Sequence, residues 1–130
     1  MAEEIKNGPE AVSLDFTFAG DSSLYGLPER IDRFQIEDTV TAVDQEGAPY
    51  RLFTADHFND QIARTSIYGV IPMVIGRAPS QGKVTSAVMW ANSADTFVDV
   101  YAPGNAKGRT CHFMSECNQL EFFLFSSKDP

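Results

Sequence analysis

The stretch VSLDFTF, residues 12–18, alternates apolar and polar side chains without a break. Its even-numbered positions are all apolar, and its odd-numbered positions are Ser, Asp and Thr. Successive side chains of a β-strand point to opposite faces, so this pattern predicts a strand with one buried face. The segment AGDSS, residues 19–23, follows directly and is rich in turn-forming residues. We therefore expect a half-buried strand that ends near residue 19.

Short runs of the same kind recur along the chain, each bounded by turn residues. They predict strands at 34–43, 50–53, 65–77, 84–90, 96–101, 109–116 and 120–127. Pro72 lies inside the third of these runs and indicates an edge strand or a bulge, because proline cannot donate to a sheet ladder. We expect the last two runs to pair around Cys117 and Asn118. No stretch of ten residues has a clean helical period, and only 57–65 is compatible with one helical turn.

Many short strands with turn signals about every 8 to 12 residues predict an all-β fold, an antiparallel sandwich or barrel. A chain of 130 residues suits one domain and can bury a core of its own. We expect a single β-sandwich domain over residues 10–126. The tails, 1–9 and 127–130, are expected to be loose.

Charge and hydropathy exclude several classes of function. The net charge is −8, which disfavours binding to the phosphate backbone of nucleic acids and to an anionic membrane surface. No apolar run reaches the roughly 18 residues that a membrane-spanning helix needs. The acidic start, MAEEIKNGPE, lacks the basic and apolar regions of a signal peptide. The chain is therefore expected to be cytosolic or to be a piece of a longer protein.

The residues offer little for metal or cofactor chemistry. Cys111 and Cys117 are the two cysteines, and they could pair across a tight hairpin or remain two buried thiols. Their spacing fits no zinc pattern, and only two histidines are present, so we expect no metal site. No glycine-rich phosphate loop occurs either, and we expect no cofactor. His112, on an expected strand, is interpreted as a structural residue.

Carboxylates with the potential for acid–base work occur at Asp56 with Asp60, at Asp95 with Asp99, and at Glu29. Most of them are expected to be solvated surface charges. Asp95 and Asp99 are four residues apart and would share a sheet face with Phe97, unless Asp95 belongs to the preceding turn.

The stretch YRLFTADHFNDQ, residues 50–61, begins like a strand and then places Phe58 among Asp56, Asn59 and Asp60. Sugars present apolar C–H faces and a rim of hydroxyls, which suit an aromatic ring beside carboxylate and amide groups. This stretch is a candidate sugar site. The alternative is that Phe58 fills the core of the domain. Trp90 is interpreted as core rather than as a ligand platform.

Five longer segments carry a resemblance to a known family. They are VSLDFTFAGDSSLYGLPER (12–30), APYRLFTADHF (48–58), SIYGVIPMVIG (66–76), VMWANSADTFVDV (88–100) and HFMSE (112–116). In this order they resemble the domain that precedes the catalytic barrel of glycoside hydrolase family 31, in particular its glucosidase II group. The resemblance covers residues 10–126, and the LYGLPE and PYRLF segments are its most specific parts.

The resemblance implies a galactose-mutarotase-like β-sandwich, in agreement with the all-β pattern. It also implies a retaining α-glucosidase that trims α-linked glucose from N-glycans in the lumen of the endoplasmic reticulum. The two catalytic carboxylates of such enzymes lie on a (β/α)₈ barrel, which needs about 250 residues. The family's nucleophile motif, Trp-x-Asp-Met-Asn-Glu, is absent from these 130 residues. We therefore expect a cut-out domain, with no catalytic residue, that is inactive alone.

In the family, the loop that matches FTADHFND walls the sugar pocket of the barrel. The resemblance thus implies that Asp56 accepts hydroxyl hydrogen bonds and that Phe58 stacks on the sugar. It implies as partners the barrel of the parent chain and the glucosidase II beta subunit. Asp95 stands where the family has Glu, so linkage preference stays open. The alternative function is a free-standing carbohydrate-binding module.

Overall fold

The computed structural model describes residues 11–20, 22–40, 47–54, 64–79, 84–104, 108–117 and 119–128. These residues form eight β-strands and no α-helix. The strands are β1 (Val12–Ala19), β2 (Ser23–Gly26), β3 (Tyr50–Leu52), β4 (Met73–Ala78), β5 (Val84–Trp90), β6 (Thr96–Tyr101), β7 (Gly108–Ser115) and β8 (Phe122–Ser127). In the described ranges no helix is long and apolar enough to cross a membrane.

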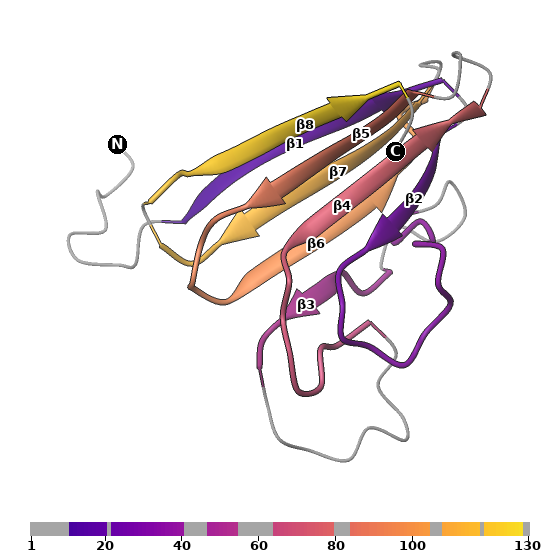
Figure 1. Cartoon of the computed structure of the whole chain (residues 1–130). Helices are drawn as coiled ribbons and strands as arrows, with labels where there is room; N and C mark the ends of the chain where they lie inside the picture. The colour runs from indigo at the N-terminus through magenta and orange to yellow at the C-terminus, as the bar shows by residue number, and fades with distance from the viewer. Residues whose placement is uncertain are drawn as a thin grey trace, which may run out of the picture.

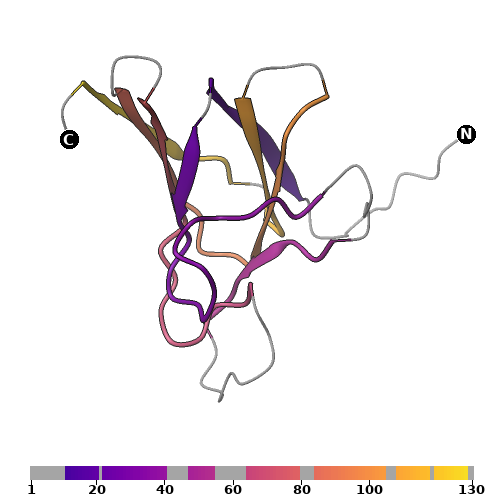
Figure 2. The ribbon, with the colours of Figure 1, turned by 90° about the vertical axis from the view of Figure 1, so that its right-hand side faces the viewer.

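The strands form two four-stranded antiparallel sheets. The first sheet has the order β1-β7-β6-β3, and the second has the order β2-β4-β5-β8 (Figure 1). Figure 2 shows the two sheets as facing layers that spread apart toward the top of the view. This arrangement confirms the expected antiparallel β-sandwich.

Alternating side chains from both sheets build the core. On β6 the positions of Thr96, Val98 and Val100 are buried, and the positions between them are half-buried. The same period places the even-numbered apolar residues of β1 toward the second sheet, where Phe16 meets Trp90 edge-on at 6.3 Å between ring centroids. The alternation seen in the sequence therefore corresponds to alternate side chains that point into the core.

Trp90 joins the two sheets at the centre of this core. Its indole is fully buried and stacks on Phe113 of β7, with ring centroids 5.6 Å apart. Its Nε1–H donates to the Ser115 hydroxyl over 2.8 Å, and the Ser115 and Thr96 hydroxyls are hydrogen-bonded at 2.6 Å. The only polar atom of the indole is thus satisfied across the interface. The interpretation of Trp90 as core is confirmed.

Most expected strands are present, and those at 84–90 and 96–101 have the expected bounds. The strand expected at 34–43 is wrong, because residues 34–40 form only an isolated bridge through Gln35. Here the Ile36 N–H donates to Leu24 of β2 over 2.8 Å, whereas the Thr39 N–H donates to Val100 of β6 over 2.7 Å. The segment passes from one sheet to the other and cannot belong to a single ladder.

Two expectations about strand pairing are also wrong. β4 begins after Pro72, lies between β2 and β5 and keeps an unbroken register with both, so Pro72 marks neither an edge strand nor a bulge in it. Proline precedes the ladder, and its carbonyl accepts from the Trp90 N–H over 2.8 Å. β7 and β8 do not pair with each other, because β7 lies between β1 and β6 and β8 lies beside β5. The connection after Ser115 crosses between the sheets rather than closing a hairpin.

The helical turn expected at 57–65 lies mostly outside the described residues.

Gly26 provides a test of the close packing of β2 and β4. Its φ is +127°, and a Cβ there would lie 2.1 Å from the Met73 carbonyl oxygen. We expect Gly26→Ala to lower the free energy of unfolding by about 2–4 kcal/mol, since strain and a backbone clash add. Gly104→Ala is the control for backbone strain without a clash, because its φ is +22° but its Cβ would meet no described atom within 4 Å. Equal losses in urea denaturation would contradict the packing.

The two thiols provide a second test. Both cysteines are free in the structure, with Cys111 buried and Cys117 partly exposed. Burial raises the pKa of the Cys111 thiol to about 12, which leaves on the order of one thiolate in ten thousand at pH 8. We expect a thiol reagent at pH 8 to label Cys117 alone in the folded protein and both cysteines in denaturant. Rapid labelling of Cys111 in the folded protein would show that the core is not closed around it.

Candidate functional site

The sugar-site residues expected from the sequence, Asp56 and Phe58, lie outside the described residues. The same is true of His57, Asn59 and Asp60. The structure does describe the chain on either side, residues 47–54 and 64–66. The geometry of these two flanks decides where the segment 55–63 starts and ends.

The two flanks are hydrogen-bonded to each other. The Arg51 N–H donates to the Arg64 carbonyl over 2.9 Å, and the Ser66 N–H donates to the Arg51 carbonyl over 3.1 Å. Arg51 and Thr65 form an isolated parallel bridge. The residues that flank the segment 55–63 on its two sides therefore lie side by side, near the end of β3. A loop with its ends fixed in this way can present side chains from a rigid base.

Arg64 holds one flank against the core. Its φ is +72°, and its guanidinium donates to the carbonyl oxygens of Ala48 over 2.9 Å and Asp38 over 3.4 Å. The guanidinium carbon also lies 5.5 Å from the centroid of the Tyr50 ring, and that of Arg30 lies 5.1 Å from it. Two cations therefore contact one buried ring, which favours a fixed position for the flank.

Tyr50 is the buried anchor of this arrangement. Its hydroxyl accepts from the Glu37 N–H over 3.0 Å. Burial raises the pKa of the Tyr50 phenol, although the Glu37 hydrogen bond and the Arg30 charge oppose the shift. The phenol is therefore a structural acceptor and donor at neutral pH rather than an acid–base group.

Arg51 and Asp95 form the main ion pair near the flanks. Arg51 Nη2 lies 2.6 Å from Asp95 Oδ2, and the Arg51 side chain is 46% exposed. The hydrogen bonds that Arg51 donates to the Asp95 carboxylate raise the pKa of the Arg51 guanidinium. The same guanidinium lies over Phe53, at 4.8 Å from the ring centroid, and over Phe97, at 5.7 Å. Asp95 lies in the turn before β6, and this turn is tied to the flank that leads into 55–63.

A pocket of about 370 Å³ opens between this turn and the flank. Leu52, Phe53 and Thr54 line one side, and Asn92, Ser93 and Asp95 line the other. Asn92 already uses its side chain within the turn, since its Oδ1 accepts from the Ala94 N–H over 2.8 Å and its Nδ2 donates to Gln119 O over 2.7 Å. The pocket combines the Phe53 ring with hydroxyl groups and with the Asp95 carboxylate that Arg51 pairs, a mixed lining of the kind that small-molecule pockets have.

The other candidate groups lie apart from this pocket. His112 Nδ1 lies 2.6 Å from Asp15 Oδ1 on the outer face of the first sheet, in keeping with a structural role. Asp99 accepts from the Thr39 hydroxyl over 2.7 Å. Within the described ranges no three His, Cys, Asp or Glu side chains form a potential metal site.

Sequence reasoning missed Arg51 and Arg64. Arg51 stands between two buried residues in the alternating run YRL, which marks it as outward-facing and available for Asp95. The sequence around Arg64 does not predict its contacts with Tyr50 and Ala48, because these contacts join residues that are far apart in the sequence.

Comparison with known proteins identifies relatives over most of the chain. The family model described as the glycosyl hydrolase 31 N-terminal galactose mutarotase-like domain matches residues 1–99. The neutral alpha-glucosidase AB of Dictyostelium discoideum is 35% identical over an alignment of 129 residues, and the match covers 95% of this chain and 13% of that protein. The glucosidase 2 subunit alpha of Saccharomyces cerevisiae is 34% identical over 123 residues, which are 94% of this chain and 12% of that protein.

A solved structure has the same fold. It is the crystal structure of an ER glucosidase II heterodimeric complex, which consists of a catalytic subunit and the binding domain of a regulatory subunit. The match has a TM-score of 0.79 and 26% sequence identity, and it covers 93% of this chain and 14% of that chain. The chain thus spans a small part of the length of the proteins it matches.

The Arg51–Asp95 pair can be tested by a double-mutant cycle of Arg51→Gln and Asp95→Asn. Because the pair is partly exposed, we expect a coupling free energy of about 0.5–1 kcal/mol in urea unfolding. The coupling should shrink in about 1 M NaCl, where charges are screened over about 3 Å. The pair Arg33 and Glu37 is the control, since it is more exposed, with side chains 78% and 44% accessible. A coupling no larger than that of the control would show that Arg51 and Asp95 do not brace the flank.

Proposed function

This chain belongs to the glycosyl hydrolase 31 N-terminal galactose mutarotase-like domain family, and we propose that it is the non-catalytic N-terminal sandwich of a glucosidase II-like α-glucosidase. The observation that carries the proposal is the family match over residues 1–99, supported by relatives that are α-glucosidases or their subunits. The described residues offer an ion pair and a half-polar pocket but no acid–base pair placed for hydrolysis. The reaction belongs to the parent protein.

In the proposed parent enzyme, hydrolysis proceeds with retention. Retention requires two carboxylates about 5–5.5 Å apart, one as nucleophile and one as acid–base. Both would lie on a (β/α)₈ barrel of about 250 residues, which is larger than this whole chain. The isolated 130-residue chain should therefore be inactive.

The role of the sandwich in catalysis is to wall the substrate pocket. Asp56 would accept hydrogen bonds from sugar hydroxyls, and Phe58 would stack on the apolar face of the leaving-group sugar. The flanks support this role, because the contacts of Arg51 and Arg64 fix both ends of the segment 55–63 on the sandwich. A pocket wall needs such a base, since a displacement of about 1 Å can be costly for catalysis.

The substrate and partners of the proposed parent follow from its relatives. The substrate is an α-linked glucose, in particular that of an N-glycan, and the compartment is the lumen of the endoplasmic reticulum. The solved relative is an ER enzyme with a regulatory subunit. A corresponding beta subunit is the proposed protein partner.

Substitution of Phe58 in the parent enzyme tests the pocket wall. We expect Phe58→Ala to raise KM for an α-1,3-linked glucose disaccharide about tenfold, because a stacked ring contributes on the order of 1.4 kcal/mol. Inhibition by free glucose should change by less than about twofold, since glucose does not reach the leaving-group position. Phe34→Ala, at an exposed ring on another segment, is the control. Equal losses for disaccharide and glucose would refute the stacking role.

A further inference from the structure

β8 is an exposed strand at the edge of the second sheet. All six of its positions, Phe122–Ser127, are exposed. Leu124 is 66% accessible and Phe125 is 50% accessible, although both are large apolar side chains in a regular strand. Soluble monomeric domains rarely expose four consecutive large apolar residues in one strand, so this exposure indicates a surface that another segment covers.

Both faces of β8 are apolar. Its register with β5 sets Phe122 beside Trp90 and Leu124 beside Val88, which places them on the core side of the sheet. Phe123 and Phe125 alternate with these two residues along the strand and therefore lie on the outer side. Apolar residues on both faces are typical of a strand that is covered on both sides, as in the interior of a larger sheet.

The edge carries none of the usual protection. Exposed edge strands are normally kept from pairing by charges, prolines, bulges or short length. The six residues of β8 include no charge and no proline, and the ladder to β5 is regular over all six. The opposite edge of the same sheet is short, and Gln35 and Ile36 cover it through contacts with Tyr25 and Leu24. Among the described residues, no strand pairs with β8 along Phe122–Ser126 on the side away from β5, so the sheet has a long edge there.

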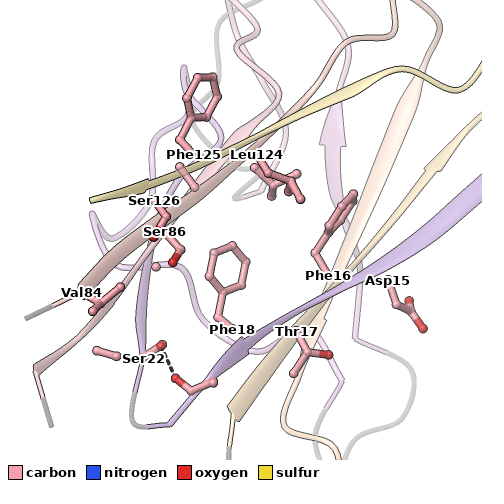
Figure 3. A pocket seen from close by; sticks show the side chains of 15 residues that line it. Asp15, Phe16, Thr17, Phe18, Ser22, Val84, Ser86, Leu124, Phe125 and Ser126 are labelled. Atoms are coloured by element: carbon pink, nitrogen blue, oxygen red, sulfur yellow. Dashed lines mark hydrogen bonds between the residues drawn. The ribbon is translucent and has the colours of Figure 1, made fainter. Parts of the chain in front are cut away.

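The sandwich is also open next to β8. A pocket of about 470 Å³ lies between β1 of the first sheet and β5 and β8 of the second. In Figure 3, Phe16 and Phe18 rise from β1 and Leu124 descends from β8 toward the same space. The Phe18 ring packs directly on the backbone of Gly76. A Cβ built on Gly76 would lie 2.2 Å from Phe18 Cδ1, so no larger residue fits there. Phe16 also meets the Phe122 ring edge-on, at 5.2 Å between ring centroids, so the two sheets are in contact beside the pocket.

From the free edge and the open pocket together we infer that β8 is an interior strand in the parent protein. A further β-strand from the same polypeptide, outside these 130 residues, hydrogen-bonds to the outer edge of β8 along Phe122–Ser126. Its alternate apolar side chains cover the mouth of the pocket between Phe16, Phe18 and Leu124. The added strand pairs with the outward N–H and C=O groups of Phe122–Ser126 and buries the exposed apolar side chains of β8.

The occupant is assigned to the same polypeptide for two reasons. The relatives contain far more chain than this sandwich, which amounts to 13% of one relative and 14% of the solved one. A strand tethered in the same chain also has an effective concentration in the millimolar range, so it outcompetes a free partner. The inference rests on the proposed function only in requiring a longer parent chain.

Hydrogen exchange of the β8 amides tests the inference. In an edge strand alternate N–H groups face solvent. We expect these amides to exchange rapidly in the 130-residue chain and at least about a hundredfold more slowly in the parent protein. Equally rapid exchange in both would overturn the inference. α-Glucosidase activity of the same parent preparation tests the proposed function separately.

Leu124→Lys provides a second measurement. In the parent protein it should lower the protection of the β8 amides at least about tenfold, because the charge would be buried under the added strand. In the 130-residue chain it should leave the midpoint of urea unfolding unchanged. Ile31→Lys is the matched control, since Ile31 is 60% accessible and lies away from β8 in sequence and sheet. It should leave β8 protection unchanged in both proteins.

A second copy of the chain is the competing occupant. It would give concentration-dependent sedimentation of the 130-residue chain that Leu124→Lys abolishes, together with unprotected β8 amides in the parent. That combination would overturn the inference of a strand from the same polypeptide.

Discussion

The hydrogen bond from the Trp90 indole to the Ser115 hydroxyl is the contact on which the sandwich depends. It joins β5 of one sheet to β7 of the other in a fully buried environment, and Thr96 of β6 completes the network. A buried polar group without a partner is costly, so the network fixes one relative position of the sheets rather than allowing them to slide. With the sheets fixed, the turn after Trp90 carries Asn92 and Asp95 to the end of β3, where the proposed loop base is formed.

The two sides of the sandwich are closed differently, and the difference relates structure to function. On one side the irregular segments cover the short strands β2 and β3, and Arg30 and Arg64 pack on the buried Tyr50 ring. This side bears the flanks of the segment 55–63, on either side of β3 and before β4 (Figure 1). The pocket lined by Asp95 also lies here. On the other side β1 and β8 leave apolar residues accessible and a pocket between the sheets. A domain whose core is covered on one side and accessible on the other is suited to packing against further chain in a larger protein.

Periodicity in the sequence predicted much of the fold. Alternation in 12–18 and β-branched runs in 84–101 identified strands because those strands have one face in the core and the other outside. Pairing was not predictable, since β7 and β8 follow each other in sequence but lie in different sheets, as do β5 and β6. The segment 34–43 misled for a physical reason: Ile36 and Thr39 contact opposite sheets, which gives the loose alternation of a strand without a ladder. At the site, the sequence indicated Asp56 and Phe58 by composition and resemblance, and these remain predictions. It did not indicate Arg64, whose contacts depend on the tertiary path of the chain.

The most direct test of the central claim, that this sandwich is part of a larger α-glucosidase, is the size and activity of the native protein. An antibody raised against the domain would be used to blot and to precipitate protein from the source cells. We expect a band many tens of kilodaltons above the 14.3 kDa of this chain, and a precipitate that releases glucose from an α-1,3-linked disaccharide. A band near 14.3 kDa, with no glucose released, would contradict the account.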